Sequence, residues 1–506
     1  MLLFELAKYA GLTSVNGYDK QIQIRGIKAE SDRVLDRDVF FALEGIRADG
    51  HSFVAEAVGN GACAIVVTKG REKEFLKLGV PVFTADNTRM AYSYALDAYN
   101  EFPSKELKII AVTGTNGKTS VSFILHSILL AIDEKCGLIG TVGCFVGKEK
   151  IISKSSDPLA NMTTPDPEQL YDLLCKMKRL GSKYVIMEAS SHASSLKKLA
   201  PLHFVASVFT NLSSEHLDFH GSMEEYFSAK LDVLKASERS VINSDTEYSG
   251  RISSALGRRK TAFVSLKNKR SDYFADGISF NGSSSTEFTL YEYGVPYNIR
   301  IGLTGLFNVE NVLHAIACAR MLGVDMHTCI LSVGRFCGVP GRMQRLLLDE
   351  HVPFSVFIDY AHTPDALEKV LLTLRATLKE KGRLITLFGC GGDRDKSKRP
   401  VMAAVAEAYS DIVTVTSDNS RSEDRERIIA DVISGFSKDF NRYTVITDRK
   451  KAIEYSIGLC REGDVLLLAG KGHEKYEIDK IGRHPFDEEN IVEECVRKYK
   501  KEDFGE

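Results

Sequence analysis

The stretch Lys108-Ile-Ile-Ala-Val-Thr-Gly-Thr-Asn-Gly-Lys-Thr-Ser120 joins a β-branched run to a glycine-rich turn that carries a Lys-Thr pair. Apolar residues at helical spacing follow, from Val121 to Leu129. This order predicts strand, loop and helix, the setting in which backbone N–H groups at a helix start bind phosphate. A strict P-loop has glycine where Val112 stands, but the Lys-Thr pair in this setting still predicts a nucleoside triphosphate site.

Two side chains of this stretch have the chemistry that phosphate binding requires. Lys118 supplies a positive charge, and the hydroxyl of Thr119 can ligate Mg²⁺. The expected nucleotide-binding residues of the loop are Gly114, Thr115, Asn116, Gly117, Lys118, Thr119 and Ser120.

Composition indicates a large soluble protein. A chain of 506 residues exceeds what one hydrophobic core usually supports, so about two to four domains are expected. The formal net charge of −2 argues against tight electrostatic binding to nucleic acid. The ten cysteines include no CxxC pair, which favours free thiols in a reducing compartment.

The chain also lacks the signals that would direct it to a membrane. Its first residues have no basic region of a signal peptide, and Glu5 interrupts their apolar stretch, which predicts an amphipathic helix. No run reaches the ~18–20 apolar residues that cross a bilayer. We therefore expect a cytoplasmic protein without membrane insertion or nucleic-acid partners.

Alternating strand-like and helical runs predict an α/β protein of three domains. Residues 1–105 would form a small α/β N-terminal domain, residues 106–337 a P-loop central ATPase domain with a mainly parallel sheet, and residues 338–506 a Rossmann-like domain. Residues 240–300 alternate in polarity and carry Gly/Ser turns, so antiparallel strands are expected there.

Polar residues follow several of the expected strands. Tyr184–Glu188 ends in a carboxylate, and the apolar runs 355–359, 384–389, 411–416 and 464–469 each lead into a polar or glycine-rich loop. Continuous apolar strands are typical of a parallel sheet that is covered on both faces, where ligands bind beyond the carboxyl ends of the strands.

Eight ordered motifs resemble those of the Mur ligases, and within that family the MurE-type UDP-N-acetylmuramoyl-tripeptide synthetases. They are TGTNGKTS (113–120), MEASSHA (187–193), TNLSSEHLDFHGSMEEYFSAK (210–230), FNVEN (307–311), PGRM (340–343), DYAHTPDAL (359–367), GCGGDRDKSKRP (389–400) and GKGHEKYE (470–477). The resemblance implies an ATP-dependent acid–amino-acid ligase of peptidoglycan synthesis. Such enzymes add a diamino acid to UDP-N-acetylmuramoyl-L-alanyl-D-glutamate through an acyl phosphate.

The resemblance also implies roles for residues near ATP. Glu188 and Thr119 would hold one Mg²⁺, while His216 would bind a second ion that a carbamate on Lys230, formed from CO₂, helps to hold. In isolation, this His would be read as a solvated residue and this Lys as a surface charge. Four further matches to the family lie near the nucleotide: Asn308, Arg342, Asp359 and His362.

For the UDP-sugar, the residues that match the family are Ser31, Thr163, Thr164, Ser190 and Lys198. The match is weaker here. The usual Asp-Ser-Arg reads Glu30-Ser31-Asp32, although the loop Ile46-Arg47-Ala48 fits, and Lys198 replaces an arginine and so loses its bidentate fork. An alternative interpretation of Thr163-Thr164-Pro165 is a helix N-cap followed by proline.

For the amino acid, the matching residues are Arg394, Asp418, Asn419, Ser420, Arg421, Gly470 and Glu474. In enzymes that add meso-diaminopimelate, the family motif at 418–421 is Asp-Asn-Pro-Arg, whose arginine can pair with the distal carboxylate. Glu474 would meet the ammonium at the same end. Ser420 replaces the proline, so meso-diaminopimelate is favoured while L-ornithine and L-lysine stay open.

Two other functions are compatible with parts of the chain. Folylpolyglutamate synthetase and other Mur-type ligases share the P-loop and the lysine, but the DxxR loop and GKGHE argue against them. A nucleotide-dependent regulatory protein that has lost ligation would not need Lys118, Glu188, His216 and Lys230 together. The partners expected are ATP, the UDP-linked dipeptide and a diamino acid, and we expect a monomer.

Overall fold

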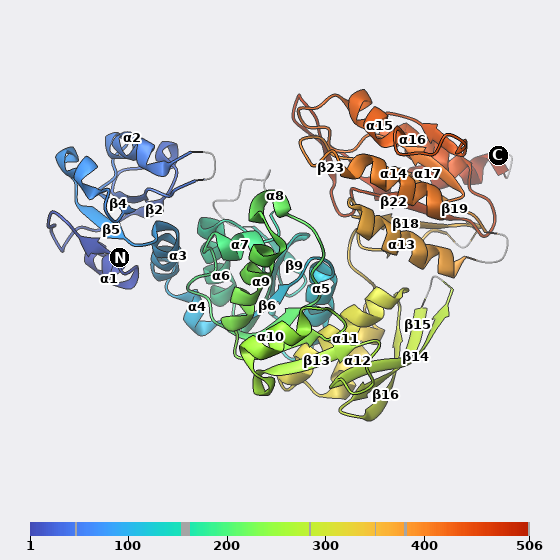
Figure 1. Cartoon of the computed structure of the whole chain (residues 1–506), viewed down its shortest axis with the longest axis horizontal. Coiled ribbons are helices and arrows are strands. Elements are labelled where there is room, and N and C mark those ends of the chain that lie inside the picture. The colour runs from blue at the N-terminus through green and yellow to red at the C-terminus, as the bar shows by residue number, and fades with distance from the viewer. Residues whose placement is uncertain (46–47, 153–161, 283–284, 350, 379–381, 504–506) are drawn as a thin grey trace. The chain divides into compact units, whose positions relative to one another are not determined.

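The computed structural model of this chain describes residues 1–45, 48–152, 162–282, 285–349, 351–378 and 382–503 (Figure 1). Ile46 and Arg47, which match the family in the loop after Ser31 on the UDP-sugar side, lie outside the described residues. The chain divides into two compact units, Met1–Ser271 with His314–Cys329, and Asp272–Leu313 with Ile330–Glu506. Among the described residues, no helix is both long and apolar enough to cross a bilayer.

The first unit begins with a five-stranded sheet in the order β1-β5-β4-β3-β2. Strands β2 to β5 run parallel, and β1 pairs antiparallel with β5. This region has the following elements: α1 (Leu3–Tyr9), β1 (Thr13–Ser14), β2 (Gly26–Lys28), β3 (Asp38–Phe41), α2 (Val54–Gly59), β4 (Ala64–Thr68), β5 (Val82–Ala85), α3 (Thr88–Tyr99) and α4 (Pro103–Glu106). The α/β character predicted for residues 1–105 is confirmed.

The same unit continues into a second sheet, with β6 between β10 and β11. Five of its residues, from Ile109 to Thr113, are buried, as expected of a β-branched strand covered on both faces. Its elements are β6 (Lys108–Thr113), α5 (Lys118–Leu129), β7 (Gly137–Gly140), β8 (Gly143–Val146), β9 (Glu149–Ile151), α6 (Pro167–Arg179), β10 (Tyr184–Glu188), α7 (Ser191–Ser195), β11 (Phe204–Phe209), α8 (Leu217–His220), α9 (Met223–Lys235), β12 (Ser240–Asn243), α10 (Ser249–Leu256) and β13 (Thr261–Ser265).

Register aligns the ends of the three central strands. Glu188 of β10 pairs with Val112 of β6, and Phe209 of β11 pairs with Thr113, so their carboxyl ends meet at one edge. Helix α5 packs on β6, β7 and β10, and α9 packs on β6 and β11. The P-loop, Glu188 and the start of the segment after β11 are thereby brought to the same place.

The antiparallel strands expected over residues 240–300 are only partly present. β12 and β13 pair in parallel, so the expectation is wrong for residues 240–265. The antiparallel strands are β14 (Tyr273–Asn281), β15 (Ser285–Glu292) and β16 (Val295–Ile301), which belong to the second unit. All residues of β12, from Ser240 to Asn243, are buried. A strand that is buried on both faces need not alternate between polar and apolar residues, so polarity could not predict its pairing.

The second unit also holds a six-stranded sheet in the order β17-β18-β22-β19-β20-β21. Strands β18, β19, β20 and β22 are parallel, as the apolar runs predicted, β21 adds a parallel strand that no apolar run indicated, and β17 is an antiparallel edge. Its strands are β17 (Gln344–Arg345), β18 (Ser355–Asp359), β19 (Leu384–Phe388), β20 (Ile412–Val415), β21 (Tyr443–Val445) and β22 (Val465–Ala469). β22 lies between β18 and β19, so the loops that follow these three strands meet at one edge of the sheet, where ligands usually bind in parallel sheets.

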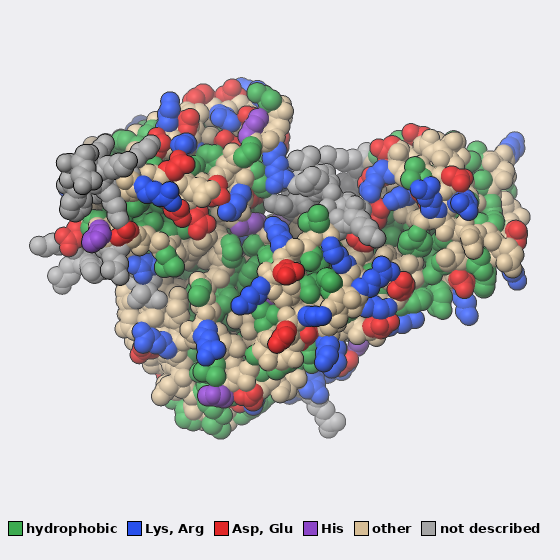
Figure 2. Space-filling view, turned by 180° about the vertical axis from the view of Figure 1, so that it is seen from behind, with side chains coloured by type: hydrophobic (Ala, Val, Ile, Leu, Met, Phe, Trp, Pro, Cys, Tyr) green, Lys and Arg blue, Asp and Glu red, His purple; other side chains and the backbone are tan. Residues whose placement is uncertain are grey.

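Helices connect these strands, and a short hairpin follows them. The helices are α11 (Leu306–Met321), α12 (Met326–Gly334), α13 (Pro364–Thr377), α14 (Lys398–Tyr409), α15 (Arg425–Ile433), α16 (Arg449–Gly458) and α17 (Glu488–Asp503), and the hairpin strands are β23 (Tyr476–Ile478) and β24 (Arg483–Pro485). Both unit boundaries near residues 313 and 329 fall within α11 and α12. On the face in Figure 2, Lys/Arg and Asp/Glu side chains are interspersed, as the small net charge would lead one to expect.

Candidate functional site

The glycine-rich loop lies between β6 and α5, as predicted. Gly117 has φ 85° directly before the helix, and Gly114 has φ 146°. A Cβ on Gly114 would lie 1.9 Å from Thr210 Oγ1, so glycine is needed both for the backbone angle and for the close approach. The N-terminus of α5 is the kind of site where backbone N–H groups bind phosphate.

Residues after β11 hold this loop in place. Asn211 Oδ1 accepts from the Asn116 backbone N–H (2.9 Å), and Thr210 Oγ1 donates to the Asn116 carbonyl (2.6 Å). The Lys118 ammonium donates to the carbonyls of Gly114 (2.9 Å) and Thr115 (2.8 Å). These hydrogen bonds fix the shape of the loop, and its lysine is folded back over the loop's own backbone.

Glu188 is fully buried at the end of β10 and accepts hydrogen bonds at both carboxylate oxygens. Oε2 accepts from the hydroxyls of Thr119 and Thr141, each at 3.0 Å, and Oε1 accepts from the Thr141 N–H at 3.0 Å. A Cβ on Gly140 would lie 2.1 Å from Oε1. Thr141 is a contact that the sequence motifs did not identify.

The Thr119–Glu188 pair fits a magnesium ion of the kind bound with nucleotides. Mg²⁺ usually takes one or two protein carboxylates or hydroxyls and completes its shell with phosphate and water. Among the residues that the structure describes, no cluster of three or more His, Cys, Asp or Glu side chains would hold a metal by itself. The donor set therefore suits an ion that arrives with ATP.

Lys230 and His216 both lie against the ring of Tyr226. Lys230 is buried in α9, and its Nζ lies 4.5 Å from the Tyr226 ring centroid and 2.8 Å from the Gly114 carbonyl oxygen, to which it donates. The ring centroids of His216 and Tyr226 are 6.1 Å apart, and His216 has φ 59°. Tyr226 OH lies 3.1 Å from Thr115 Oγ1 in the P-loop.

The ammonium of Lys230 is in surroundings that disfavour its charge. Burial lowers its pKa well below the ordinary value, and the charge of Lys118 lowers it further, while Glu215 acts in the opposite direction. The structure therefore provides a lysine that loses its proton more readily than a solvated one, which carbamate formation requires.

Three of the residues predicted for the UDP-sugar meet beside Glu188. Thr164 Oγ1 donates to the Glu188 carbonyl (2.8 Å) and accepts from the Ser190 N–H (3.0 Å), and the hydroxyl oxygens of Thr163 and Thr141 lie 3.1 Å apart. The N-cap interpretation of Thr163-Thr164-Pro165 is wrong, because α6 begins at Pro167 with Asp166 as its N-cap. Ser190 is instead the N-cap of α7, where its Oγ accepts from the Ala193 N–H.

The other two predicted UDP-sugar residues have carboxylate partners. Lys198 is buried, and its Nζ lies 2.6 Å from Asp166 Oδ1. Ser31 follows β2 in the first sheet, and its hydroxyl donates to Glu56 Oε2 (2.8 Å). The residues around Ser31 reach the helix that follows Thr163 and Thr164, because Lys28 Nζ and Arg33 Nη2 lie 2.5 Å and 3.2 Å from carboxylate oxygens of Glu168 in α6.

The remaining nucleotide candidates lie in the second unit. The Asp359 carboxylate, at the end of β18, accepts from the backbone N–H groups of Met343 (2.6 Å) and Ala361 (2.7 Å). Burial raises the pKa of Asp359, opposed by Arg342, whose guanidinium carbon lies 4.6 Å from the Tyr360 ring centroid. His362 Nδ1 is 2.8 Å from the Tyr360 carbonyl, and Asn308 donates to the Thr304 carbonyl (2.8 Å).

The predicted amino-acid residues gather at the carboxyl ends of β19, β20 and β22. Arg421 has φ 50°, and its Nη1 donates to the carbonyls of Gly392 (2.8 Å) and Asn419 (3.3 Å). A Cβ on Gly392 would lie 2.0 Å from the Ser420 carbonyl oxygen, so the two loops pack closely. Arg394, by contrast, is exposed and bonds to the adjacent Asp393 carbonyl at 3.4 Å.

Two carboxylates of this region have opposite pKa shifts. Burial would raise the pKa of Asp418, but the charges of Lys471 and Arg449 outweigh it and lower the pKa. Burial raises the pKa of Glu474, and the charge of Asp418 adds to the effect. Gly470 has φ 115°, and a Cβ there would lie 2.7 Å from Asp418 Oδ2, so glycine keeps this carboxylate in place.

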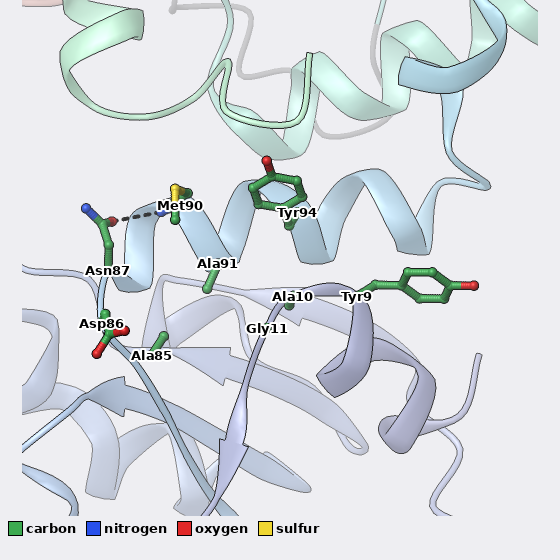
Figure 3. Close-up of a pocket in the computed structure, with 9 residues that line it drawn as sticks. All are labelled: Tyr9, Ala10, Gly11, Ala85, Asp86, Asn87, Met90, Ala91 and Tyr94. Carbon is green, nitrogen blue, oxygen red and sulfur yellow. Dashed lines mark hydrogen bonds between the residues drawn. The ribbon is translucent and has the colours of Figure 1, made fainter. Parts of the chain in front are cut away.

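A separate cavity of about 210 Å³ lies in the first sheet region (Figure 3). It is lined by residues from the end of α1, the end of β5 and the start of α3: Tyr9, Ala10, Gly11, Ala85, Asp86, Asn87, Met90, Ala91 and Tyr94. None of the predicted site residues is among them, and Asn87 is used to cap α3 through the Met90 N–H. The cavity is therefore distinct from the sites above.

Comparison with known proteins matches all three parts of the chain to one family. Residues 23–100 match the catalytic domain of the Mur ligase family, residues 112–319 the Mur ligase middle domain, and residues 341–472 the glutamate ligase domain of Mur ligases. The UDP-N-acetylmuramoyl-L-alanyl-D-glutamate–2,6-diaminopimelate ligase of Clostridium tetani is 37% identical over 98% of this chain and 99% of its own length. This chain belongs to the Mur ligase family.

Other relatives agree with this assignment. The ligase of the same name from Aquifex aeolicus is 38% identical to this Mur ligase over 94% of each chain. A solved structure of a ligase of that name has a TM-score of 0.69 and 29% identity, and the match covers 99% of both chains. MurF from Thermotoga maritima in complex with ADP has a TM-score of 0.58 at 18% identity, which concerns the fold alone.

Membership fixes the general chemistry of this Mur ligase. It is an ATP-dependent ligase that forms a carbon–nitrogen bond, and enzymes of the family use ATP and Mg²⁺. The sequence analysis assigned no role to Thr141, which lies outside the eight motifs, or to Tyr226, which lies within the motif 210–230. Tyr226 had a usable signal, because it lies four residues before Lys230 and therefore on the same face of a helix.

Proposed function

We propose that this Mur ligase joins meso-diaminopimelate to the D-glutamate carboxylate of UDP-N-acetylmuramoyl-L-alanyl-D-glutamate. ATP is converted to ADP and phosphate in the same reaction. The observation that carries the proposal is 37% identity over 98% of the chain to a ligase named for this reaction. The Asp418–Arg421 loop supports it, because it retains three of the four residues of the diaminopimelate motif.

In the first step, an oxygen of the D-glutamate carboxylate attacks the γ-phosphorus of ATP, and the bond to the β-phosphate oxygen breaks. Lys118 and the N–H groups of the loop at the start of α5 would bind the phosphates. Thr119 and Glu188 would hold Mg²⁺, which neutralises phosphate charge when bound. The products of this step are an acyl phosphate and ADP.

In the second step, an uncharged amino group of the diamino acid attacks the acyl carbon. The carbon–nitrogen bond forms, phosphate leaves with the electrons of the carbon–oxygen bond, and the nitrogen loses a proton. Thr163, Thr164, Ser190, Lys198 and Ser31 are proposed to bind the UDP-sugar. Asn308, Arg342, Asp359 and His362 are proposed to contact the nucleotide.

Lys230 is proposed to act as a carbamate. Its neutral amine would attack CO₂, forming a nitrogen–carbon bond and releasing one proton, and the resulting anion would help His216 to hold a second Mg²⁺. Burial beside Lys118 supports this, because both features favour the neutral amine that the reaction needs. A positive lysine would instead repel the cation.

The amino acid is proposed to bind between the 389–394 loop and residues 418–421 and 470–474. Arg421 and Arg394 would pair with carboxylates, and Glu474 would pair with the distal ammonium. L-Ornithine and L-lysine lack the distal carboxylate, so Arg421 would have no partner on them. The place of Arg421 supports the assignment, because its guanidinium donates to the carbonyls of Gly392 and Asn419 and is thus held between the two loops even though Ser420 replaces the proline.

An ADP-release assay tests the proposal. The enzyme is given ATP, Mg²⁺ and the UDP-linked dipeptide, with meso-diaminopimelate, L-lysine or L-ornithine in separate reactions. ADP release that needs both the dipeptide and meso-diaminopimelate is the expected result. Efficient use of lysine or ornithine alone would overturn the choice of amino acid, and no ligation with any of them would favour a regulatory protein. We further propose that the enzyme acts as a monomer in the cytoplasm.

A further inference from the structure

Lys471 is a buried lysine that the proposed mechanism does not use. It lies between Gly470 and Gly472, and its side chain is 0% exposed. Its Nζ lies 3.0 Å from the Tyr476 carbonyl oxygen, 3.2 Å from Asn419 Oδ1 and 3.5 Å from Asp418 Oδ1. An ammonium has three donors and no acceptor, so these three oxygens match its capacity.

The contact with Lys471 determines the orientation of the Asn419 side-chain amide. Asn419 Oδ1 accepts from the Lys471 ammonium and from the Ile478 N–H (2.9 Å), and neither donor would tolerate an NH₂ group in its place. The NH₂ group of Asn419 is therefore directed at Glu474, where it donates to Oε2 at 2.7 Å. Lys471 thus acts on Glu474 through the Asn419 amide.

The contact with Tyr476 fixes the main chain beside the same carboxylate. Lys471 donates to the backbone carbonyl of Tyr476, two residues after Glu474. One ammonium therefore anchors both the amide that donates to Glu474 and the main chain that follows Glu474. Burial and the charge of Asp418 raise the pKa of Glu474, whereas Asn419, Lys471 and Tyr476 favour its ionised form.

We propose that Lys471 is a positioning residue for amino-acid selection, which fixes the Glu474 carboxylate in place to receive the distal ammonium of the diamino acid. The inference rests on the proposed function, since it assumes that Glu474 meets that ammonium. Its consequence is specific: loss of Lys471 weakens recognition of the distal amino group, while the rest of the substrate is bound as before.

The test compares meso-diaminopimelate with 2-aminopimelate, which lacks only the distal amino group. The ratio of their kcat/KM values is measured for the wild type and for Lys471→Met. A fall of about tenfold or more in this ratio is expected, with KM for ATP within about twofold of wild type. A purely structural loss would lower both kcat/KM values alike and leave the ratio unchanged, which would overturn the proposal.

A double-mutant cycle with Glu474→Gln tests the route of the effect. If Lys471 acts through Glu474, Lys471→Met should change the ratio little once Glu474 is already replaced. Multiplicative effects of the two substitutions would contradict the proposal. If Lys471→Met does not fold, Lys471→Arg keeps the charge beside Asp418 but presents a planar fork, and it is expected to lower the same ratio.

Failure of this inference can be told from failure of the proposed function. A wild-type enzyme that ligates no diamino acid contradicts the function itself. A wild type that ligates diaminopimelate, with Glu474→Gln lowering the ratio and both Lys471 variants leaving it unchanged, contradicts only the role of Lys471. If the wild type prefers L-lysine, the same comparison is made between L-lysine and norleucine.

Discussion

Lys118 and Lys230 donate to the same acceptor, the carbonyl oxygen of Gly114, at 2.9 Å and 2.8 Å. Two ammonium groups that meet at one oxygen repel each other, and Lys230 is the more deeply buried member of the pair. Lys118, the P-loop lysine, is needed as a cation to bind phosphate. Burial and the repulsion therefore lower the pKa of Lys230. The geometry therefore favours an uncharged Lys230.

Lys230→Ala should remove most turnover while ATP and the UDP-linked dipeptide still bind. The carbamate that would help hold the second Mg²⁺ cannot form, and a short-chain carboxylate at millimolar concentration should restore part of the rate. ADP release with and without the added carboxylate measures this. Lys235→Ala, on the exposed part of the same helix, is the control and should leave the rate unchanged. Full activity of Lys230→Ala would contradict the carbamate.

Gly140→Ala should reduce turnover by displacing the carboxylate of Glu188. The new Cβ would lie 2.1 Å from Glu188 Oε1, so the carboxylate must move away from Thr119 and the proposed Mg²⁺. A loss of about 10²-fold in kcat is expected, comparable to that of Glu188→Gln. Gly250→Ala is the matched control, since nothing lies within 4 Å of a Cβ there. Unchanged kcat in Gly140→Ala would mean that Glu188 does not act from this position.

Arg421→Ala should lower the preference for meso-diaminopimelate over L-lysine by about 2–4 kcal/mol, because a buried pair between arginine and the distal carboxylate is lost. The measurement is the ratio of kcat/KM for the two amino acids. Arg427→Ala removes an exposed arginine of α15 and should leave the ratio unchanged. An unaltered ratio in Arg421→Ala would assign the distal carboxylate to another residue.

Glu423→Gln should destabilise the second unit in a pH-dependent way. Hydrogen bonds from the buried Arg399 guanidinium, at 2.9 and 3.1 Å, lower the pKa of Glu423 to about 2. The unfolded carboxyl titrates near 4.5, so the stabilisation is complete above that pH and is lost as pH falls towards 2. A loss of about 1–2 kcal/mol at pH 7 is expected, allowing for screening of a partly accessible pair.

Chemical denaturation at pH 7, 5 and 3 checks this prediction. The difference in unfolding free energy between wild type and Glu423→Gln should be equal at pH 7 and 5 and smaller at pH 3. The exposed Glu462→Gln is the control and should follow the wild type throughout. A difference that grows as pH falls would contradict the assigned direction of the shift.

Much of the fold could be predicted because the signals are local. β6, the P-loop and α5 are contiguous in sequence, and the largely buried strands β18, β19, β20 and β22 are apolar runs bounded by turns. The prediction failed at β12 and β13, where whether neighbouring strands run parallel or antiparallel depends on which strand lies beside them. That choice is made by tertiary packing, and the sequence within the strand does not record it.

The site was predictable where motifs carry chemistry and less so where contacts are distant in sequence. The proximity of Thr119 and Glu188 follows from strand order, and the structure places them 3.0 Å apart. The bonds from Ser31 to Glu56 and from Lys198 to Asp166 join residues with no shared pattern. The role of Lys471 could not be predicted, because a lysine in a glycine-rich loop is usually solvated and only the structure shows that this one is buried.

The main chain of Glu188, as well as its side chain, takes part in the proposed site. Its carboxylate accepts from Thr119, while its carbonyl accepts from Thr164, so one residue borders both the proposed metal position and the proposed sugar position. A shift of the Glu188 backbone would change the binding of both ligands. Thermodynamic reciprocity then requires that, if the UDP-linked dipeptide tightens nucleotide binding, the nucleotide tightens dipeptide binding by the same factor. With such a coupling, enzyme that holds only one of the two ligands would be less populated than independent binding predicts.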